Sequence, residues 1–277
     1  MSQAATPGLE LPAAASWLSC TSAQLRIELL LLLRQPENLL VILVLPVLLL
    51  VFFAGAHLGP TGSGRPVNFL LPGVLTLALM STGMVTLSIS TAYQRYYLVL
   101  KRLGASPLPR SALVAAKAAA VLLVEAVQVV LLAAIGYLAF GWRPSGSVPL
   151  ALLVMLLGAV MFAAVGLTLA GAVRAEFTLG GANGLYLLFL VIGGVFVPVS
   201  RLPGPVAAVA RLLPPAALSS CLRTVLAGNP LPGGDLALLV GWTVVAGAAA
   251  VRQRAKIRTQ FSTVPAPTGT CATRSRR

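Results

Sequence analysis

YQRYYLVLKRLGASPLPR, residues 93–110, is a short basic segment between two long apolar runs. It carries four cations and no acid: Arg95, Lys101, Arg102 and Arg110. The flanking runs, at about 69–92 and 111–140, are continuous rather than alternating in hydrophobicity. Continuous apolar runs of this length predict membrane-spanning helices rather than the strands of a barrel. The segment is therefore expected to be a loop that joins two spans at the membrane surface.

The composition of the whole chain also indicates a membrane protein. Of its 277 residues, 58% are hydrophobic and only 9% are charged, whereas a soluble domain carries about 25% charged residues. Such a chain has too few polar side chains to cover a water-exposed surface. Within lipid every backbone amide must be paired inside the protein, which favours helices. The expected fold class is an all-α integral membrane protein.

The formal net charge of +14 could suggest nucleic-acid binding, but the distribution of the charge argues against it. Lysines and arginines flank the apolar runs, as the positive-inside rule requires. The basic cluster at the C-terminus has Phe261 as its only aromatic residue, so nucleic acid is not expected as a partner. The single histidine, His57, and three cysteines without ligand spacing predict no metal site.

Four regions are expected along the chain. They are a disordered N-terminus at 1–16, an interfacial helix at 17–35, a six-span transmembrane domain at 36–251, and a basic, disordered cytoplasmic tail at 252–277. The spans are expected at about 39–56, 69–92, 111–140, 149–173, 178–199 and 236–251. Counted with both termini inside, 15 of the 20 Lys and Arg residues lie on the inner side and five on the outer side. This bias predicts a multi-pass protein of the plasma membrane with both termini cytoplasmic.

The stretch from Trp17 to Arg34 is interpreted as an amphipathic helix in the membrane interface. The apolar residues near one face are Trp17, Leu18, Leu25, Leu29 and Leu32. The polar residues that interrupt the other faces are Gln24, Arg26, Glu28 and Arg34. The alternative is that this stretch only begins the first span. Pro36 favours a helix boundary instead.

Residues 200–235 are expected outside, yet they are not hydrophilic. The apolar stretches 206–213 and 216–226 are each too short to span. They predict a re-entrant hairpin broken at Pro214-Pro215 before the sixth span. The alternative is an ordinary surface loop, at the cost of exposing apolar side chains.

The glycine spacing of Gly59 and Gly64 is that of a phosphate-binding loop, but the residues that follow exclude it. Arg65 and Pro66 stand where lysine and Ser/Thr would be needed, and no soluble strand precedes the loop. The chain therefore shows no ATPase site of its own.

Several local patterns together resemble one known family. They are Arg34-x-Pro36 followed by Pro46, the run Leu100-Lys-Arg-Leu-Gly-Ala-Ser-Pro-Leu108, Gly193-Gly-Val-Phe-x-Pro198, Leu202-Pro203, Leu213-Pro214 and Leu222-Arg223. In this order, with six spans, the chain resembles the permease subunit of type-2 ATP-binding-cassette exporters, a group that includes bacterial drug-efflux permeases linked to antibiotic resistance. The chain departs from the family pattern at Tyr96, where an acid is usual, and at Leu98, where glycine is usual.

The resemblance implies that ATP binding and membrane transport belong to different subunits. ATP and magnesium would bind a separate ATP-binding-cassette subunit, and this chain would bind no cofactor and would not be an enzyme. The permease would pair with a second copy or a sibling permease and contact membrane lipid.

The basic loop is the expected contact with the ATP-binding subunit. Cations could pair with acids of the partner, leucines could fill a groove, and Gly104 with Pro107 would end the helix. The residues are Arg95, Leu98, Leu100, Lys101, Arg102, Leu103, Gly104 and Pro107. The alternative is that the cations only fix the topology. The interfacial helix, with Trp17, Arg26 and Arg34, is a second expected contact.

Polar residues within the spans are the other candidates. Glu125 lies mid-span, with Gln128 one turn further on and Lys117 two turns earlier, and Asn183 lies in the fifth span. A charge at this depth is costly, so these side chains are expected to face protein or water. They could line a substrate path or a subunit interface, with Asn183 bonding across the interface. A purely structural hydrogen bond from Glu125 and a proton relay are the alternatives. Gly180-Gly181 and Gly193-Gly194 are expected to allow close helix packing.

The expected function is the membrane-spanning part of an ATP-driven exporter that moves an amphipathic, drug-like or lipid-like compound. The alternative is an ion- or proton-coupled secondary transporter, which would need paired intramembrane acids and an inverted repeat. An intramembrane enzyme is disfavoured, because His57 is the only histidine and lies at a membrane edge.

Overall fold

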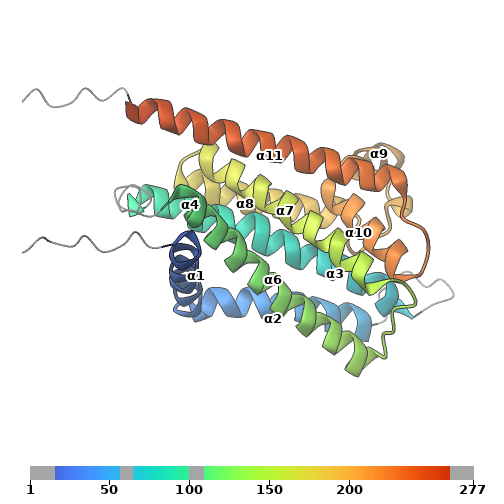
Figure 1. Cartoon of the computed structure of the whole chain (residues 1–277). Helices are drawn as coiled ribbons and strands as arrows, with labels where there is room; N and C mark the ends of the chain where they lie inside the picture. Colours follow the sequence, from blue (N-terminus) through green and yellow to red (C-terminus); the bar gives the residue numbers. More distant parts are fainter. Residues whose placement is uncertain (1–15, 57–64, 100–108, 263–277) are drawn as a thin grey trace, which may run out of the picture.

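The computed structural model describes residues 16–56, 65–99 and 109–262, and these residues form helices and no strand. In chain order the elements are α1 (Trp17–Leu33), α2 (Pro36–Gly55), α3 (Pro66–Met80), the π-helix η1 (Ser81–Thr86), α4 (Leu87–Tyr96), α6 (Arg110–Phe140), α7 (Val148–Ala172), α8 (Ala175–Ile192), the 3₁₀ turn η2 (Val199–Arg201), α9 (Gly204–Leu212), α10 (Pro214–Leu226) and α11 (Gly233–Ser262). The long helices lie side by side in one bundle (Figure 1). The predicted all-α fold is confirmed.

Five helices in the described ranges are long and apolar enough to cross a membrane. They are Pro66–Tyr96, Ser111–Phe140, Val148–Ala172, Ala175–Ile192 and Gly233–Arg252. The apolar part of α2, Leu39–Gly55, is a shorter helix, and with it the count reaches the six spans predicted. The span Pro66–Tyr96 is the most deeply buried of the five and forms the centre of the core.

The outer segment before α11 is a bent helix pair. α9 and α10 meet at an angle of 81°, at Leu213, immediately before the two prolines where we predicted a break. Figure 1 places both helices at the end of the bundle opposite to α1. Most of α10 is buried, so its apolar residues are covered by protein.

A half-buried arginine fixes α10 in place. The Arg223 guanidinium donates to the carbonyl oxygens of Phe69 (3.2 Å), Gly194 (3.0 Å) and Val195 (2.8 Å). It also lies 3.7 Å from the centre of the Phe69 ring. Arg223 thus ties the hairpin to the start of α3 and to the turn that follows α8.

One predicted span boundary was wrong. The fifth span ends at Ile192 rather than Val199, because Gly193 closes the helix and Gly194 takes a left-handed φ of 68°. The sixth span ends at Arg252, one residue from the predicted Val251, and the helix α11 itself continues through Ser262. Residues 1–15 and 263–277 lie outside the described residues.

The predicted glycine packing holds at one of its two places. A Cβ on Gly193 would lie 2.8 Å from Pro215 of α10, so a larger residue would not fit there. Among the described residues, nothing lies within 4 Å of a would-be Cβ on Gly180 or Gly181. The expected close packing at these two glycines is therefore not found in the described part of the chain.

α1 lies across one end of the bundle, as expected of an interfacial helix (Figure 1). Two of its polar residues, however, lie elsewhere than expected. Gln24 and Glu28 are buried against the bundle, and Leu30 and Leu33 are exposed. The reason is that α6 and α4 offer polar partners to this face, while exposed leucines are acceptable at a lipid surface. The rest of the pattern holds in part, because Leu25, Leu29 and Leu32 are half-buried and Arg26 and Arg34 are exposed.

A proline in α2 explains the position of Gln128. Pro46 has no backbone N–H, so the carbonyl of Ile42, four residues earlier, loses its helical donor. The Gln128 Nε2 on α6 donates to this carbonyl oxygen at 2.9 Å, and the Thr82 hydroxyl donates to the Gln128 Oε1 at 2.8 Å. One buried amide thus joins α2, η1 and α6.

We predict that Gln128→Leu lowers the free energy of unfolding by about 1–3 kcal/mol, because it leaves the Ile42 carbonyl and the Thr82 hydroxyl without a partner. Equilibrium unfolding in mixed micelles measures the effect. Pro46→Ala supplies the missing N–H within α2. The cost of Gln128→Leu should therefore be smaller in the Pro46→Ala background, and an equal cost in both backgrounds would contradict this role.

Candidate functional site

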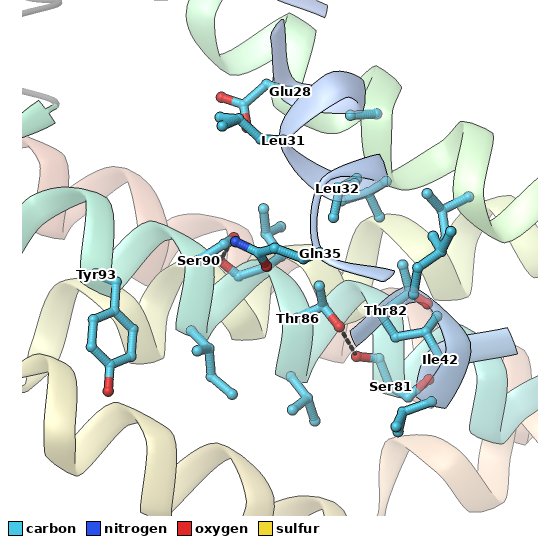
Figure 2. Close-up of a pocket in the computed structure, with 18 of the residues that line it drawn as sticks. Glu28, Leu31, Leu32, Gln35, Ile42, Ser81, Thr82, Thr86, Ser90 and Tyr93 are labelled. Atoms are coloured by element: carbon cyan, nitrogen blue, oxygen red, sulfur yellow. Dashed lines mark hydrogen bonds between the residues drawn. The ribbon is translucent and has the colours of Figure 1, made fainter. Parts of the chain in front are cut away.

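A cavity of about 860 Å³ lies among α1, α2, η1, α4, α6 and α8. Its walls are mainly aliphatic, and this volume is within the range of sites that hold drug-sized molecules. Leucines, isoleucine and proline from α1 and α2 form one side: Leu31, Leu32, Leu39, Ile42, Leu45 and Pro46. Figure 2 shows the α1 and η1–α4 sides facing each other across this space.

A polar stripe runs along the opposite side. Ser81, Thr86, Ser90 and Gln94 all line the cavity, and their spacing is five, four and four residues. In a plain α-helix a step of five would turn the second residue away from the first. The π-helix at Ser81–Thr86 has a wider turn, which brings Thr86 into line with Ser81. Figure 2 shows Ser81, Thr86 and Ser90 following one another along this helix.

Glu28 is the centre of a polar cluster at the α1 end of the cavity. Its Oε1 lies 2.9 Å from the Lys117 Nζ of α6 and accepts a hydrogen bond from the Gln24 Nε2 at 3.1 Å. Its Oε2 accepts from the Gln94 Nε2 of α4 at 3.5 Å. The side chains of Lys117 and Glu28 are only 9% and 11% exposed. The cluster connects three helices, and Glu28, Gln94 and Lys117 all line the cavity.

The four polar residues expected to act together are in fact divided between two places. Lys117 and Asn183 line the cavity, whereas Glu125 and Gln128 do not. Lys117 does not share a patch with Glu125, because Glu28 attracts it toward α1. Asn183 donates to the Leu179 carbonyl of its own helix at 2.9 Å, so the bond we expected across an interface is not made within the chain.

Glu125 is buried behind the π-helix. It is 3% exposed, and neither carboxyl oxygen has a hydrogen-bond partner among the described residues. A Cβ on Gly83 would lie 3.3 Å from its Oε1, so the carboxyl group packs directly against η1. The structural hydrogen bond considered for Glu125 is therefore not found in the described part of the chain.

Arg95 is bound within the chain instead of facing outward. Its Nη1 donates to the Gly171 carbonyl at 3.0 Å and its Nη2 to the Val173 carbonyl. These carbonyls lie where α7 ends and has no helical donors left, which favours a cation. Arg95 therefore makes bonds inside the chain, and its contact with a partner subunit stays a prediction. Leu100, Lys101, Arg102, Leu103, Gly104 and Pro107 lie outside the described residues.

The interfacial-helix residues have different environments. The Trp17 indole Nε1 donates to the Ser111 hydroxyl at 3.0 Å, which ties the start of α1 to the start of α6. Arg26 and Arg34 are exposed and remain free to contact a partner or lipid headgroups.

The end of α4 carries an exposed aromatic group. Tyr97 stacks on Tyr93 and meets Tyr96 edge-on. Leu98 follows with a φ of 58°, the left-handed conformation that glycine adopts without strain. This position is the one where the family pattern has glycine.

Sequence reasoning missed the central role of Glu28, which was treated as a surface residue of α1. The available signal was Gln24 and Glu28, two polar residues one turn apart within an apolar helix. It also treated Arg223 only as part of a motif, although an unpaired arginine within an apolar stretch indicates buried carbonyl partners.

Apolar helices around a cavity with a polar stripe define a multi-pass membrane protein of the transport class. The chain belongs to the ABC-2 type transporter family, whose family model matches residues 20–226. It is the permease subunit of such a transporter, as the sequence patterns predicted. None of the curated proteins compared with the chain matches it.

We predict that Leu98→Gly raises the free energy of unfolding by about 0.5–1 kcal/mol. Glycine relieves the left-handed strain, and the greater freedom of the unfolded chain offsets part of the gain. Leu98→Ala is the matched control, because it keeps the Cβ that causes the strain. Equal stability of the two variants in detergent micelles would contradict this account.

We predict that Glu28→Gln and Lys117→Met each lower the free energy of unfolding by about 3–5 kcal/mol, because each leaves one buried charge unpaired. The double variant Glu28→Gln/Lys117→Met should recover much of this loss. Glu176→Gln, at an exposed glutamate of α8, is the control and should change little. Additive losses in the double variant would show that the two charges do not depend on each other.

Proposed function

We propose that this permease is the membrane-spanning part of an ATP-driven exporter in the plasma membrane, and that it moves amphipathic compounds through the cavity. The observation that carries this proposal is the cavity itself, because it joins an aliphatic side to a polar stripe within one space of drug-sized volume. A compound with both kinds of surface is the ligand that such walls fit.

The energy is proposed to come from a separate ATP-binding-cassette subunit, which would hold ATP and magnesium. The described residues of this chain include no cluster of metal-ligating side chains. The basic loop between α4 and α6 is the proposed contact. Both of its flanking helices reach Glu28, through Gln94 on one side and Lys117 on the other, so a push on the loop would act directly on the inner end of the cavity.

The complete transporter is proposed to contain two permeases, as two copies or as siblings, and both termini of each are proposed to be cytoplasmic. The large apolar side chains exposed on α2 and α8, such as Leu48, Phe52, Phe177 and Val191, are available to lipid or to a second permease.

The experiment that tests the function is transport by inside-out vesicles that contain the permease and its co-purifying ATPase. Uptake of an amphipathic substrate should require ATP and should be abolished by vanadate. Co-purification of a P-loop ATPase with the tagged permease is the independent measurement. ATP-independent uptake driven by a pH gradient would instead favour a secondary transporter.

Glu125 is the one observation that favours that second candidate, because a buried, unpartnered carboxyl group could carry a proton. If the protein were a proton-coupled carrier, Glu125→Gln would abolish uptake both with and without ATP. The exporter proposed here should retain ATP-driven uptake in this variant.

We predict that charge reversal of the loop, Lys101→Glu/Arg102→Glu, reduces transport and substrate-stimulated ATP hydrolysis by about tenfold or more while the protein still inserts, because paired charges at a subunit contact become repulsive. Arg252→Glu changes an exposed cation at the end of the last span and is the matched control. Unchanged transport in the loop variant would show that its cations serve only topology.

A further inference from the structure

The hydroxyl groups of the polar stripe have already used their hydrogens. Ser81 donates to the Ala78 carbonyl at 2.9 Å, Thr86 donates to the Ser81 carbonyl at 3.2 Å, and Ser90 donates to the Leu87 carbonyl at 3.2 Å. A hydroxyl oxygen that donates its hydrogen can still accept. These three residues therefore offer acceptors to the cavity rather than donors.

The stripe continues into a second kind of acceptor. The Gln94 Nε2 is bound to Glu28, while its Oε1 is buried and accepts no hydrogen bond from the described residues. A buried acceptor without a donor is costly. This oxygen has less than 1 Å² of accessible surface, so a ligand hydroxyl can donate to it only when the Gln94 side chain turns toward the cavity. From Ser81 to Gln94 the stripe is about 20 Å long at the helical rise per residue.

The charges around the cavity are balanced. Glu28 and Lys117 are the only charged residues that line it in the described part of the chain, and they are paired with each other. A ligand with a net charge would therefore find no free counter-charge in the described lining, and its own charge would lose water without compensation. An uncharged ligand does not carry this cost.

The remaining lining residues indicate the shape of the ligand. Asn183 and Tyr186 of α8 line the cavity and add groups that can both donate and accept. The side formed by α1 and α2 is mainly aliphatic, for example at Leu32 and Ile42, with Glu28 and Gln35 as its polar members. A polar stripe that faces a mainly aliphatic side fits a molecule that is polar along one edge, rather than one with a polar head and an apolar tail.

We propose that the cavity binds uncharged, facially amphipathic compounds that carry several hydroxyl groups along one edge. The hydroxyl edge donates to Ser81, Thr86, Ser90 and Gln94, and the apolar edge packs on α1 and α2. This inference names the substrate class of the proposed exporter and rests on that function.

The test uses the full chain in lipid nanodiscs and a fluorescent amide of a trihydroxysterol whose three hydroxyls lie on one face. Fluorescence anisotropy measures its binding, with empty nanodiscs correcting for partition into lipid. The tri-O-methyl ether of the same probe has lost all three hydroxyl donors and should bind at least tenfold more weakly. Probes of the same skeleton with an ammonium or a sulfonate group should also bind more weakly than the triol.

Substitutions in the cavity lining test whether the probe binds there. Thr86→Val, Ser90→Ala and Gln94→Leu should each weaken binding of the triol by roughly two- to tenfold, the value of one hydrogen bond, and should leave binding of the ether unchanged. Ser88→Ala is the matched control, because Ser88 is buried in the same helix and lies outside the cavity lining. Its binding should equal that of the unaltered protein.

No binding of the triol above empty nanodiscs, equal binding of triol and ether, or preferred binding of either charged probe would overturn the inference. If any of these results occurs while another amphiphile is taken up in a vanadate-sensitive way, the proposed substrate class is wrong and the exporter function still holds. Triol binding without ATP-dependent uptake would support the cavity chemistry and contradict the exporter.

Discussion

Every backbone carbonyl within the bilayer needs a donor, and this constraint accounts for most of the polar side chains placed in the apolar part of this protein. Gln128 serves the carbonyl that Pro46 leaves unpaired, and Arg95 serves the end of α7. Arg223 serves the carbonyls of the turn that follows α8, and Arg65 donates to Gly141 where α6 ends, at 2.6 Å. Each donor comes from another helix, so satisfying the backbone also fixes how the helices pack.

This constraint separates the polar residues that hold the fold from those that can contact a ligand. Gln128, Arg95 and Arg223 have carbonyl partners and do not line the cavity. The stripe on η1 and α4 is different, because its hydroxyls bond only to their own helix and leave their oxygens facing the cavity. The π-helix matters here because it brings the first part of the stripe into register with the rest.

The sequence was sufficient for the number, order and approximate limits of the spans, because continuous hydrophobicity and flanking charge both depend only on the membrane. It was sufficient for the family, since the loop and hairpin patterns occur in order. It was not sufficient for the orientation of α1, because at a lipid surface apolar residues can face outward and only the polar partners on α4 and α6 show which face is inside. For the same reason the ion pair between Lys117 and Glu28 could not be predicted. The only sequence signal of the π-helix was the five-residue spacing between the polar residues Ser81 and Thr86.

The position of Glu28 links the cavity with the basic loop. One carboxylate binds Gln94, two residues before the end of the span that leads into the loop, and Lys117, in the second turn of the helix that leaves it. All three side chains also line the cavity. The two helices that flank the loop are thus joined to the cavity lining through one carboxylate of α1.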